Sequence, residues 1–278
     1  MSARPALNLA YAIPPTSRKA TRWRDGFTAA VELLEARFDV RRLNIHPDAP
    51  EQRAALERLP DCDVILANSN WRWIVDRLVR RRLGRSRPPV ALKIAGAGDP
   101  PRRRRMRFYD LLFYETPWYE PRIARHPRRL HAFGVDTRVM RPEPGTERDV
   151  DWLSVGALKP YKRHELLAGR TGRRVVVGDS VGADPATVTT LRREGVELHD
   201  FGSYEELAGW YRRSRNVLVA ATTEGGGERA LFEARACGAE VHTAGDNPKL
   251  EQLRDMPLWD HRYYANRLAA GLGELVSA

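Results

Sequence analysis

The chain has few cysteines and no long apolar run. Cys62 and Cys237 are its only cysteines, and the seven histidines are scattered, so neither a disulfide scaffold nor a metal site is expected. No segment approaches the length that crosses a membrane, and no positively charged start leads into an apolar stretch. We therefore expect a soluble, cytoplasmic protein without an integral membrane segment.

Acidic residues are scarce in the first half of the chain relative to basic ones. Residues 1–150 contain 30 Lys and Arg against 18 Asp and Glu, whereas residues 151–278 contain 17 against 18. The formal net charge of +11 thus belongs to the first half, and it is densest at 80–87 (RRRLGRSR) and 102–107 (RRRRMR). Codon bias explains arginine in place of lysine but not this asymmetry, which favours a polyanionic partner.

The most informative segment is a glycine loop between an apolar run and a helix pattern. Residues 217–221 (VLVAA) are typical of a buried parallel strand, Gly225, Gly226 and Gly227 follow, and a helix pattern covers about 229–237. Consecutive glycines let backbone N–H groups approach an anion, and a helix N-terminus adds partial positive charge. The loop therefore indicates a phosphate or diphosphate site; an ordinary strand-to-helix turn is the alternative.

Two further strands with basic loops surround this segment in the sequence. Residues 151–165 (DWLSVGALKPYKRHE) form a strand pattern that ends at Gly156 and continues into a loop with Lys162 and Arg163. Residues 173–179 (RRVVVGD) form another. Strands that alternate with helices predict a doubly wound α/β domain, in which ligands bind outside the carboxyl ends of the strands. Lys162, Arg163 and the glycine loop could converge there on one diphosphate.

Four segments of this half and its border resemble a known family. They are HAFGVDTRVMRP (131–142), VGALKPYKR (155–163), FGSYEELAGWYRRS (201–214) and EGGGERALFEARACGAEV (224–241). Together they resemble the retaining glycosyltransferases of family 4, which have the GT-B fold of two Rossmann-like doubly wound domains that face a cleft. The likeness covers about residues 129–249, and the chain would be a compact member.

The resemblance implies a domain plan. Residues 1–145 would form a strongly basic acceptor-side domain, and residues 146–255 a domain that binds the nucleotide sugar. Residues 256–278 would form a helix that crosses back to the first domain. Proline, glycine and charge interrupt the apolar pattern at 141–149, where we place the boundary.

The resemblance also implies donor-binding residues. Glu233 matches the family's second glutamate, which holds the ribose, and Lys162 matches the lysine on the diphosphate. The family's arginine after the strand-end Gly156 is Ala157 here, and Arg163 or Lys159 would compensate.

The first family glutamate has no exact match, because seven residues should separate it from Glu233. Either Glu224, which is one residue further away, keeps the contact with the sugar or the reacting face, or Glu228 has taken it. We favour Glu224.

For the acceptor side, the family's acid or histidine after the fourth strand matches the region of Asp99, a candidate acceptor contact or base. Candidate acceptor-binding cations are Arg18, Lys19, Arg102, Arg103, Arg104 and Arg105.

These inferences predict a retaining, metal-independent hexosyltransferase. It would use a nucleotide sugar, most simply a UDP-sugar, as co-substrate and need no other cofactor. The basic half favours a hydroxymethylated pyrimidine base in DNA as acceptor. A lipid or polysaccharide at an anionic membrane is one alternative, and a non-catalytic GT-B protein that binds a nucleotide sugar or nucleic acid is another.

Overall fold

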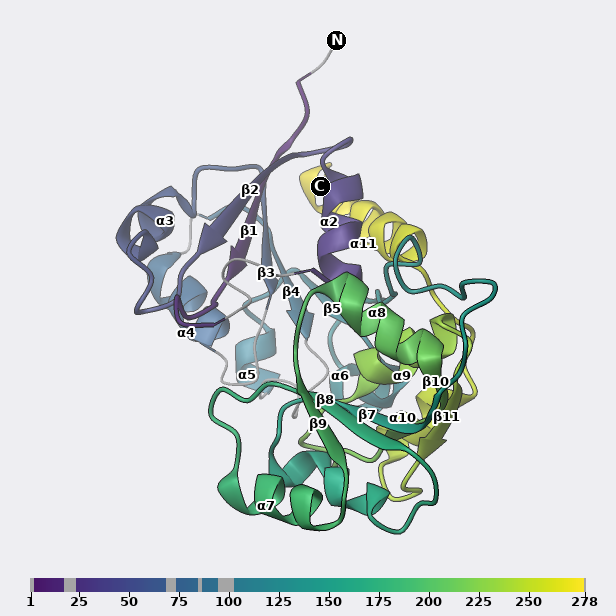
Figure 1. Cartoon of the computed structure of the whole chain (residues 1–278). Helices are drawn as coiled ribbons and strands as arrows, with labels where there is room; N and C mark the ends of the chain where they lie inside the picture. The colour runs from purple at the N-terminus through teal and green to yellow at the C-terminus, as the bar shows by residue number, and fades with distance from the viewer. Residues whose placement is uncertain (1–2, 18–23, 69–73, 85–86, 95–102, 278) are drawn as a thin grey trace. The chain divides into compact units, whose positions relative to one another are not determined.

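A computed structural model describes residues 3–17, 24–68, 74–84, 87–94 and 103–277, which form two compact units (Figure 1). Unit 1 comprises Met1–Gly134 and Asp260–Ala278, and unit 2 comprises Val135–Trp259. Each unit is built on one parallel sheet with intervening helices. The predicted α/β class with two doubly wound domains is confirmed.

The division at Gly134 precedes the boundary predicted near residue 145. Side-chain contacts attach the intervening segment to unit 2: Arg212 donates to the carbonyls of Val139 and Arg141, and Cys237 Sγ lies 3.8 Å from Met140 Sδ. The proline- and glycine-containing stretch is thus a loop within unit 2, and the last helix belongs to unit 1.

Unit 1 contains a six-stranded sheet in the order β2-β1-β3-β4-β5-β6. Its elements are β1 (Ala6–Tyr11), α2 (Gly26–Leu34), β2 (Asp39–Asn44), α3 (Gln52–Arg58), β3 (Val64–Asn68), α4 (Ile74–Arg82), β4 (Val90–Ile94), α5 (Arg103–Met106), β5 (Leu111–Tyr114), η1 (Pro117–Tyr119), α6 (Glu120–Ile123), β6 (Arg129–His131) and α11 (His261–Val276).

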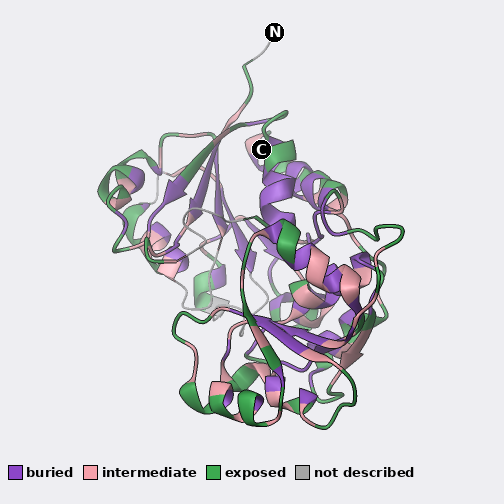
Figure 2. Ribbon diagram, in the orientation of Figure 1, coloured by how far each residue is buried: buried purple, intermediate pink, exposed green. Residues whose placement is uncertain are grey.

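The inner strands of this sheet are apolar because helices cover both of their faces. Val75 of α4, Met106 of α5 and Ile123 of α6 belong to one core cluster on one face. On the other face α2 packs against α11, where the Phe27 and Tyr264 rings lie 5.9 Å apart. Figure 2 shows the strands buried between these helices.

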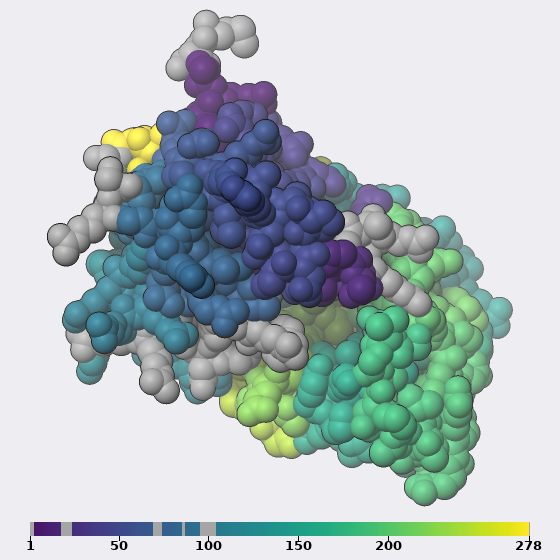
Figure 3. Space-filling view, turned by 90° about the vertical axis from the view of Figure 1, so that its left-hand side faces the viewer, coloured from purple at the N-terminus to yellow at the C-terminus, as the bar shows by residue number. Residues whose placement is uncertain are grey.

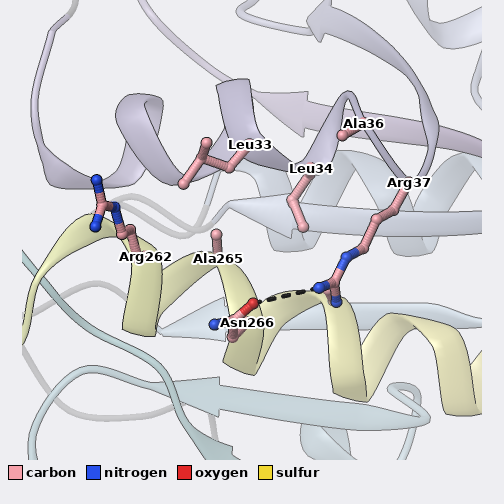
Figure 4. Close-up of a pocket in the computed structure, with 8 residues that line it drawn as sticks. Leu33, Leu34, Ala36, Arg37, Arg262, Ala265 and Asn266 are labelled. Atoms are coloured by element: carbon pink, nitrogen blue, oxygen red, sulfur yellow. Dashed lines mark hydrogen bonds between the residues drawn. The ribbon is translucent and has the colours of Figure 1, made fainter.

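A groove of about 340 Å³ opens between α2 and α11 (Figure 4). Leu33 and Leu34 line it from α2, Ala265 and Asn266 line it from α11, and Arg37 Nη2 lies 3.5 Å from Asn266 Oδ1. None of the residues that the sequence predicts for a site lines this groove.

Unit 2 contains a five-stranded sheet in the order β11-β10-β7-β8-β9. Its elements are β7 (Val150–Val155), η2 (Pro160–Lys162), η3 (His164–Leu167), β8 (Arg174–Gly178), α7 (Pro185–Arg193), β9 (Glu197–Asp200), α8 (Tyr204–Arg213), β10 (Ser214–Val219), α9 (Glu228–Ala236), β11 (Glu240–Thr243) and α10 (Pro248–Arg254). The segment that follows β7 forms two short 3₁₀ turns, η2 and η3, and no α-helix.

Each sheet has a switch point, where the order in which the chain adds parallel strands reverses from one side of the sheet to the other. It lies between β1 and β3 in unit 1, and between β7 and β10 in unit 2. Ligands of such sheets bind at the carboxyl ends of the strands beside the switch point. Within the described part of the chain, no helix is long and apolar enough to span a membrane, and no three potential metal-ligating side chains of His, Cys, Asp or Glu cluster.

Candidate functional site

The loops that follow β7 and β10 contact each other at the unit 2 switch point. The Thr222 N–H donates to the Tyr161 carbonyl at 2.9 Å. A Cβ built on Gly225 would lie 2.7 Å from the same carbonyl oxygen, closer than a side chain can approach. Glycine is therefore required where the two backbones meet, and the two basic and glycine-rich loops singled out in the sequence share one place in the fold.

The glycine loop leaves the N-terminus of α9 without a side-chain cap. Gly226 and Gly227 have positive φ angles of 68° and 112°, and Gly227 is the N-cap residue. By contrast, the neighbouring helices α7, α8 and α10 have the capping side chains Asp184, Ser203 and Asn247. Within the described residues, the N–H groups of Gly226 and Gly227 donate to no acceptor. Free N–H groups at a helix N-terminus bind anions.

Lys162 is a cation close to the start of α9, where it interacts electrostatically with Glu228. Its side chain packs on Gly156, whose Cβ, if present, would lie 3.1 Å from Lys162 Cε. Burial lowers the pKa of Lys162 to about 8; Glu228 opposes this shift, and Arg229 and Lys249 add to it. Among the described residues, the ammonium has neither a hydrogen-bond acceptor nor a carboxylate in salt-bridge contact. A half-buried cation of this kind gains most from an added anion.

The two glutamates that the sequence left as alternatives differ in their surroundings. Glu228 is buried at the first position of α9, with its Oε1 3.2 Å from the Lys249 ammonium. Lys249 also donates to the Thr223 carbonyl, so the pair holds the loop before α9. Glu224 is exposed, and no described side chain or backbone group binds its carboxylate. Of the two, only Glu224 is open to a ligand in this structure.

Arg163 is bound to unit 2 itself. Its guanidinium makes two 2.6 Å bonds to the Asp246 carboxylate, and its Nε donates to the Ala220 carbonyl at 2.6 Å. These bonds connect the loop after β7 with the loops after β10 and β11. Sequence reasoning missed Asp246 and Lys249, because each follows β11 and is separated from its partner by many residues.

Glu233 is buried, and tyrosines of α8 bind both of its carboxylate oxygens. The Tyr204 hydroxyl lies 3.2 Å from Oε1 and the Tyr211 hydroxyl 3.3 Å from Oε2. Burial, with Glu233 nearby, raises the pKa of Tyr211 well above its usual value. The sequence contains a signal for these tyrosines, since a seven-residue spacing places both on one face of a helix.

The strand ends of unit 1 are described only in part. The predicted residues Arg18, Lys19, Asp99 and Arg102 lie outside the described residues, and Arg103 begins α5. Arg104 and Arg105 of α5 are exposed.

A buried polar cluster that the sequence analysis did not assemble lies at the ends of β4, β5 and β6. It consists of the Lys93–Glu115 ion pair, whose atoms lie 2.5 Å apart, and of His131, whose Nε2 lies 3.1 Å from the Glu115 carbonyl. Burial lowers the pKa of His131.

Comparisons with known proteins identify the fold. No family model matches the chain, and no curated protein sequence matches it. Three solved structures that it resembles are glycosyltransferases or proteins bound to a nucleotide sugar. AviGT4, a glycosyltransferase involved in avilamycin A biosynthesis, has a TM-score of 0.67 at 17% identity over 98% of both chains.

The second structure is HepE from Anabaena in complex with UDP-glucose, with a TM-score of 0.63 at 13% identity over 99% of this chain and 92% of that one. The third is an α-glucosyltransferase in complex with UDP-glucose and DNA containing an abasic site, with a TM-score of 0.56 at 11% identity over 99% and 91%. The chain therefore has the GT-B fold.

Proposed function

We propose that the protein is a retaining, metal-independent glycosyltransferase of the family 4 type that uses a UDP-sugar. The observation that carries this proposal is that Lys162, half-buried near the uncapped N-terminus of α9, has no carboxylate in salt-bridge contact among the described residues. Two structures with the same fold are complexes with UDP-glucose, which supports a nucleotide sugar as the anion.

In this proposal the loops of unit 2 stabilise the leaving diphosphate. Lys162 and the N–H groups of Gly226 and Gly227 bind its oxygens as negative charge develops on them, so cationic side chains and amides do the work that a metal ion does in other enzymes. Arg163, bound to Asp246, fixes the shape of the loop. Glu224, which is exposed, is assigned to the sugar hydroxyls.

Glu233 is assigned to the ribose diol. The Tyr204 and Tyr211 hydroxyls contact its two carboxylate oxygens and so fix the orientation of the carboxylate. A carboxylate is a suitable acceptor for the hydroxyls of a diol.

We further propose that the acceptor is a hydroxymethylated pyrimidine in DNA. Unit 1 contains 29 Lys and Arg against 16 Asp and Glu, whereas unit 2 contains 18 against 20. This excess favours a polyanion, and one structure of the same fold was determined with DNA. Asp99 is kept as the candidate acceptor contact or base, with Arg18, Lys19 and residues 102–105 as acceptor-binding cations.

Incubation with radiolabelled UDP-glucose and hydroxymethylcytosine-containing DNA tests this proposal. Label in the DNA is the expected result, and transfer only to a lipid or polysaccharide extract would assign a different acceptor. If no member of a donor panel is transferred or hydrolysed while donor or DNA still binds, the protein is a binding module.

The variant Glu233→Ala should lose at least about tenfold in donor affinity, since two charge-assisted hydrogen bonds are removed. The matched control is Glu240→Ala, which removes an exposed carboxylate from unit 2. Equal donor affinity in the two variants would remove Glu233 from the site.

A further inference from the structure

One stretch of unit 1 accounts for the chain's whole excess of positive charge. Residues 74–129, from α4 to the start of β6, contain 16 Lys and Arg against 5 Asp and Glu, and this difference equals the net charge of +11. Only one of the sixteen is a lysine, Lys93, and it is buried in an ion pair with Glu115.

The helices of this stretch lie together on one face of the six-stranded sheet. They connect β3, β4, β5 and β6, which are consecutive neighbours in the sheet, and their apolar side chains share one core cluster. Crossovers between neighbouring parallel strands have the same hand and so place α4, α5 and α6 side by side. In Figure 3 the blue atoms of the α4 region and the blue-green atoms of the chain that follows lie on the same face of unit 1.

The described acidic residues of this stretch are all bound to other groups. Asp76 is buried between Arg80 and the Tyr109 hydroxyl. Asp110 binds Arg87, and Glu120 accepts from the Tyr114 hydroxyl.

As a result, most of the exposed arginines of this stretch have no anionic partner among the described residues. No hydrogen bond, ion pair or ring contact is made there by the side chains of the exposed arginines Arg77, Arg81, Arg104, Arg105, Arg107, Arg125 and Arg128. We call these seven residues the arginine face.

A high arginine content alone does not explain the arginine face, because most arginines of unit 2 bind a carbonyl or a carboxylate of their own unit. Arg148 donates to the carbonyls of Ser214 and Gly238, and Arg213 binds Asp149. Arginines of unit 2 such as these are bound within their own unit, whereas the seven of the arginine face are left open.

The chemistry of the arginine face fits phosphates of a nucleic acid better than a lipid surface. A guanidinium binds a phosphate through two parallel hydrogen bonds. Peripheral membrane surfaces also insert apolar side chains, and none of the large hydrophobic residues that are exposed in the described structure belongs to residues 74–129.

We propose that the arginine face binds the phosphate backbone of double-stranded DNA without sequence preference. This inference rests on the proposed function in one respect: it takes DNA as the acceptor and identifies where the duplex beside the modified base is held. The proposal therefore assigns the main phosphate contacts to the exposed side of α4, α5 and the segment after α6. The sequence alone had assigned them to the loops that contain Arg18, Lys19 and residues 102–105.

A binding assay without donor tests the proposal. The variant Arg81→Gln/Arg105→Gln/Arg125→Gln removes one cation from each part of the face. The control variant Arg53→Gln/Arg192→Gln/Arg254→Gln changes the net charge equally on α3, α7 and α10. Affinity for an unmodified duplex of about 30 base pairs is measured between about 50 and 200 mM salt.

The face variant should lose about tenfold or more in affinity, and its slope of log K against log salt should be smaller by about 3 than that of the unaltered protein. The control should bind nearly as the unaltered protein does. Equal losses in the two variants would overturn the proposal, since net charge alone would then account for binding.

Two further readouts separate this proposal from the proposed function. UDP-glucose affinity and thermal midpoint should be unchanged in the face variant, because the proposed donor residues lie in unit 2 and the replaced side chains make no hydrogen bond or ion pair with the described residues. Loss of binding to vesicles containing phosphatidylserine, with DNA affinity unaltered, would assign the face to a membrane instead. Selective loss of DNA affinity supports the face even if no sugar is transferred to DNA.

Discussion

The arginines of unit 2 and those of the arginine face in unit 1 differ in how they are used. In unit 2 most arginines bind a carboxylate or a carbonyl of the same unit, and Lys162 at the switch point is a half-buried cation without such a contact among the described residues. In unit 1 the seven arginines of the arginine face are exposed and have no partner in the described structure. A single desolvated charge suits one defined anion, whereas a spread of solvated charges suits a long polyanion.

This difference has a consequence for the response to salt. Ions screen interactions between exposed charges within about 10 Å at 0.1 M salt, and they screen buried charges much less. Donor affinity should therefore change little with salt, while affinity for DNA should fall steeply. The predictions below test each side of this contrast.

The largest effect is expected from Lys162→Met. A charge-assisted bond to a phosphate in a partly buried site contributes about 2–3 kcal/mol, so UDP-glucose affinity should fall about 100-fold. The fold should be retained, since burial of an ammonium disfavours the folded state, as the lowered pKa of Lys162 indicates. Isothermal titration calorimetry measures the affinity, and a thermal melt checks the fold.

Lys159→Met is the matched control for this variant. Lys159 lies on the same loop and its loss should cost less than about fivefold, because it interacts electrostatically with Asp184. If the two variants bind UDP-glucose equally, Lys162 has no special place in the site.

Gly225→Ala should have the next largest effect. The added methyl group would meet the Tyr161 carbonyl at 2.7 Å, so the backbones of the two loops must separate. We expect a loss of about tenfold or more in donor affinity, because Lys162 and the N–H groups after Gly225 would no longer be aligned. Gly209→Ala on α8 is the control, since nothing lies within 4 Å of its added methyl group. Equal donor affinity in both variants would contradict the contact between the loops.

Donor affinity should also depend on pH. Lys162 has a pKa of about 8 in the free protein, and a bound diphosphate would raise it, so binding takes up a proton above pH 8. Affinity should be level below pH 8 and then fall by up to tenfold per pH unit. Calorimetry between pH 7 and 9 measures this fall, and Lys162→Met should abolish it. A fall of equal size in the variant would assign the titration to another group.

The strands and the loops that meet at the unit 2 switch point were predictable because local signals specify them. Apolar runs identified β7, β8 and β10 to within a few residues, and Gly225, Gly226 and Gly227 predicted the glycine loop before α9. The sheet order then places Gly156 and Gly225 together, since parallel strands end at the same edge.

Long-range contacts were not predictable in this way. Nothing local to Glu228 reveals that it binds Lys249, or that Glu233 lies between Tyr204 and Tyr211. The arginine-rich segments could be read from the sequence. Whether each arginine side chain forms an ion pair depends on which carboxylates the fold brings close to it. Asp76 and Asp110 could have neutralised exposed arginines, and they bind Arg80 and Arg87 instead.

The smallest effect is expected on the free energy of unfolding, when one arginine of each unit is replaced by alanine. Arg148 donates to the carbonyls of Ser214, at the start of β10, and Gly238, just after α9, so Arg148→Ala leaves two carbonyls without their donor. We expect a loss of about 1–2 kcal/mol in the free energy of unfolding. Arg105→Ala should change it by less than about 0.5 kcal/mol, because its side chain has no partner among the described residues. Urea unfolding measures the free energy of unfolding of both variants. Similar losses would mean that Arg105 stabilises its unit as much as Arg148 does. The expected inequality would instead mean that Arg105 is kept for a partner outside the chain, and its loss should then appear in DNA affinity.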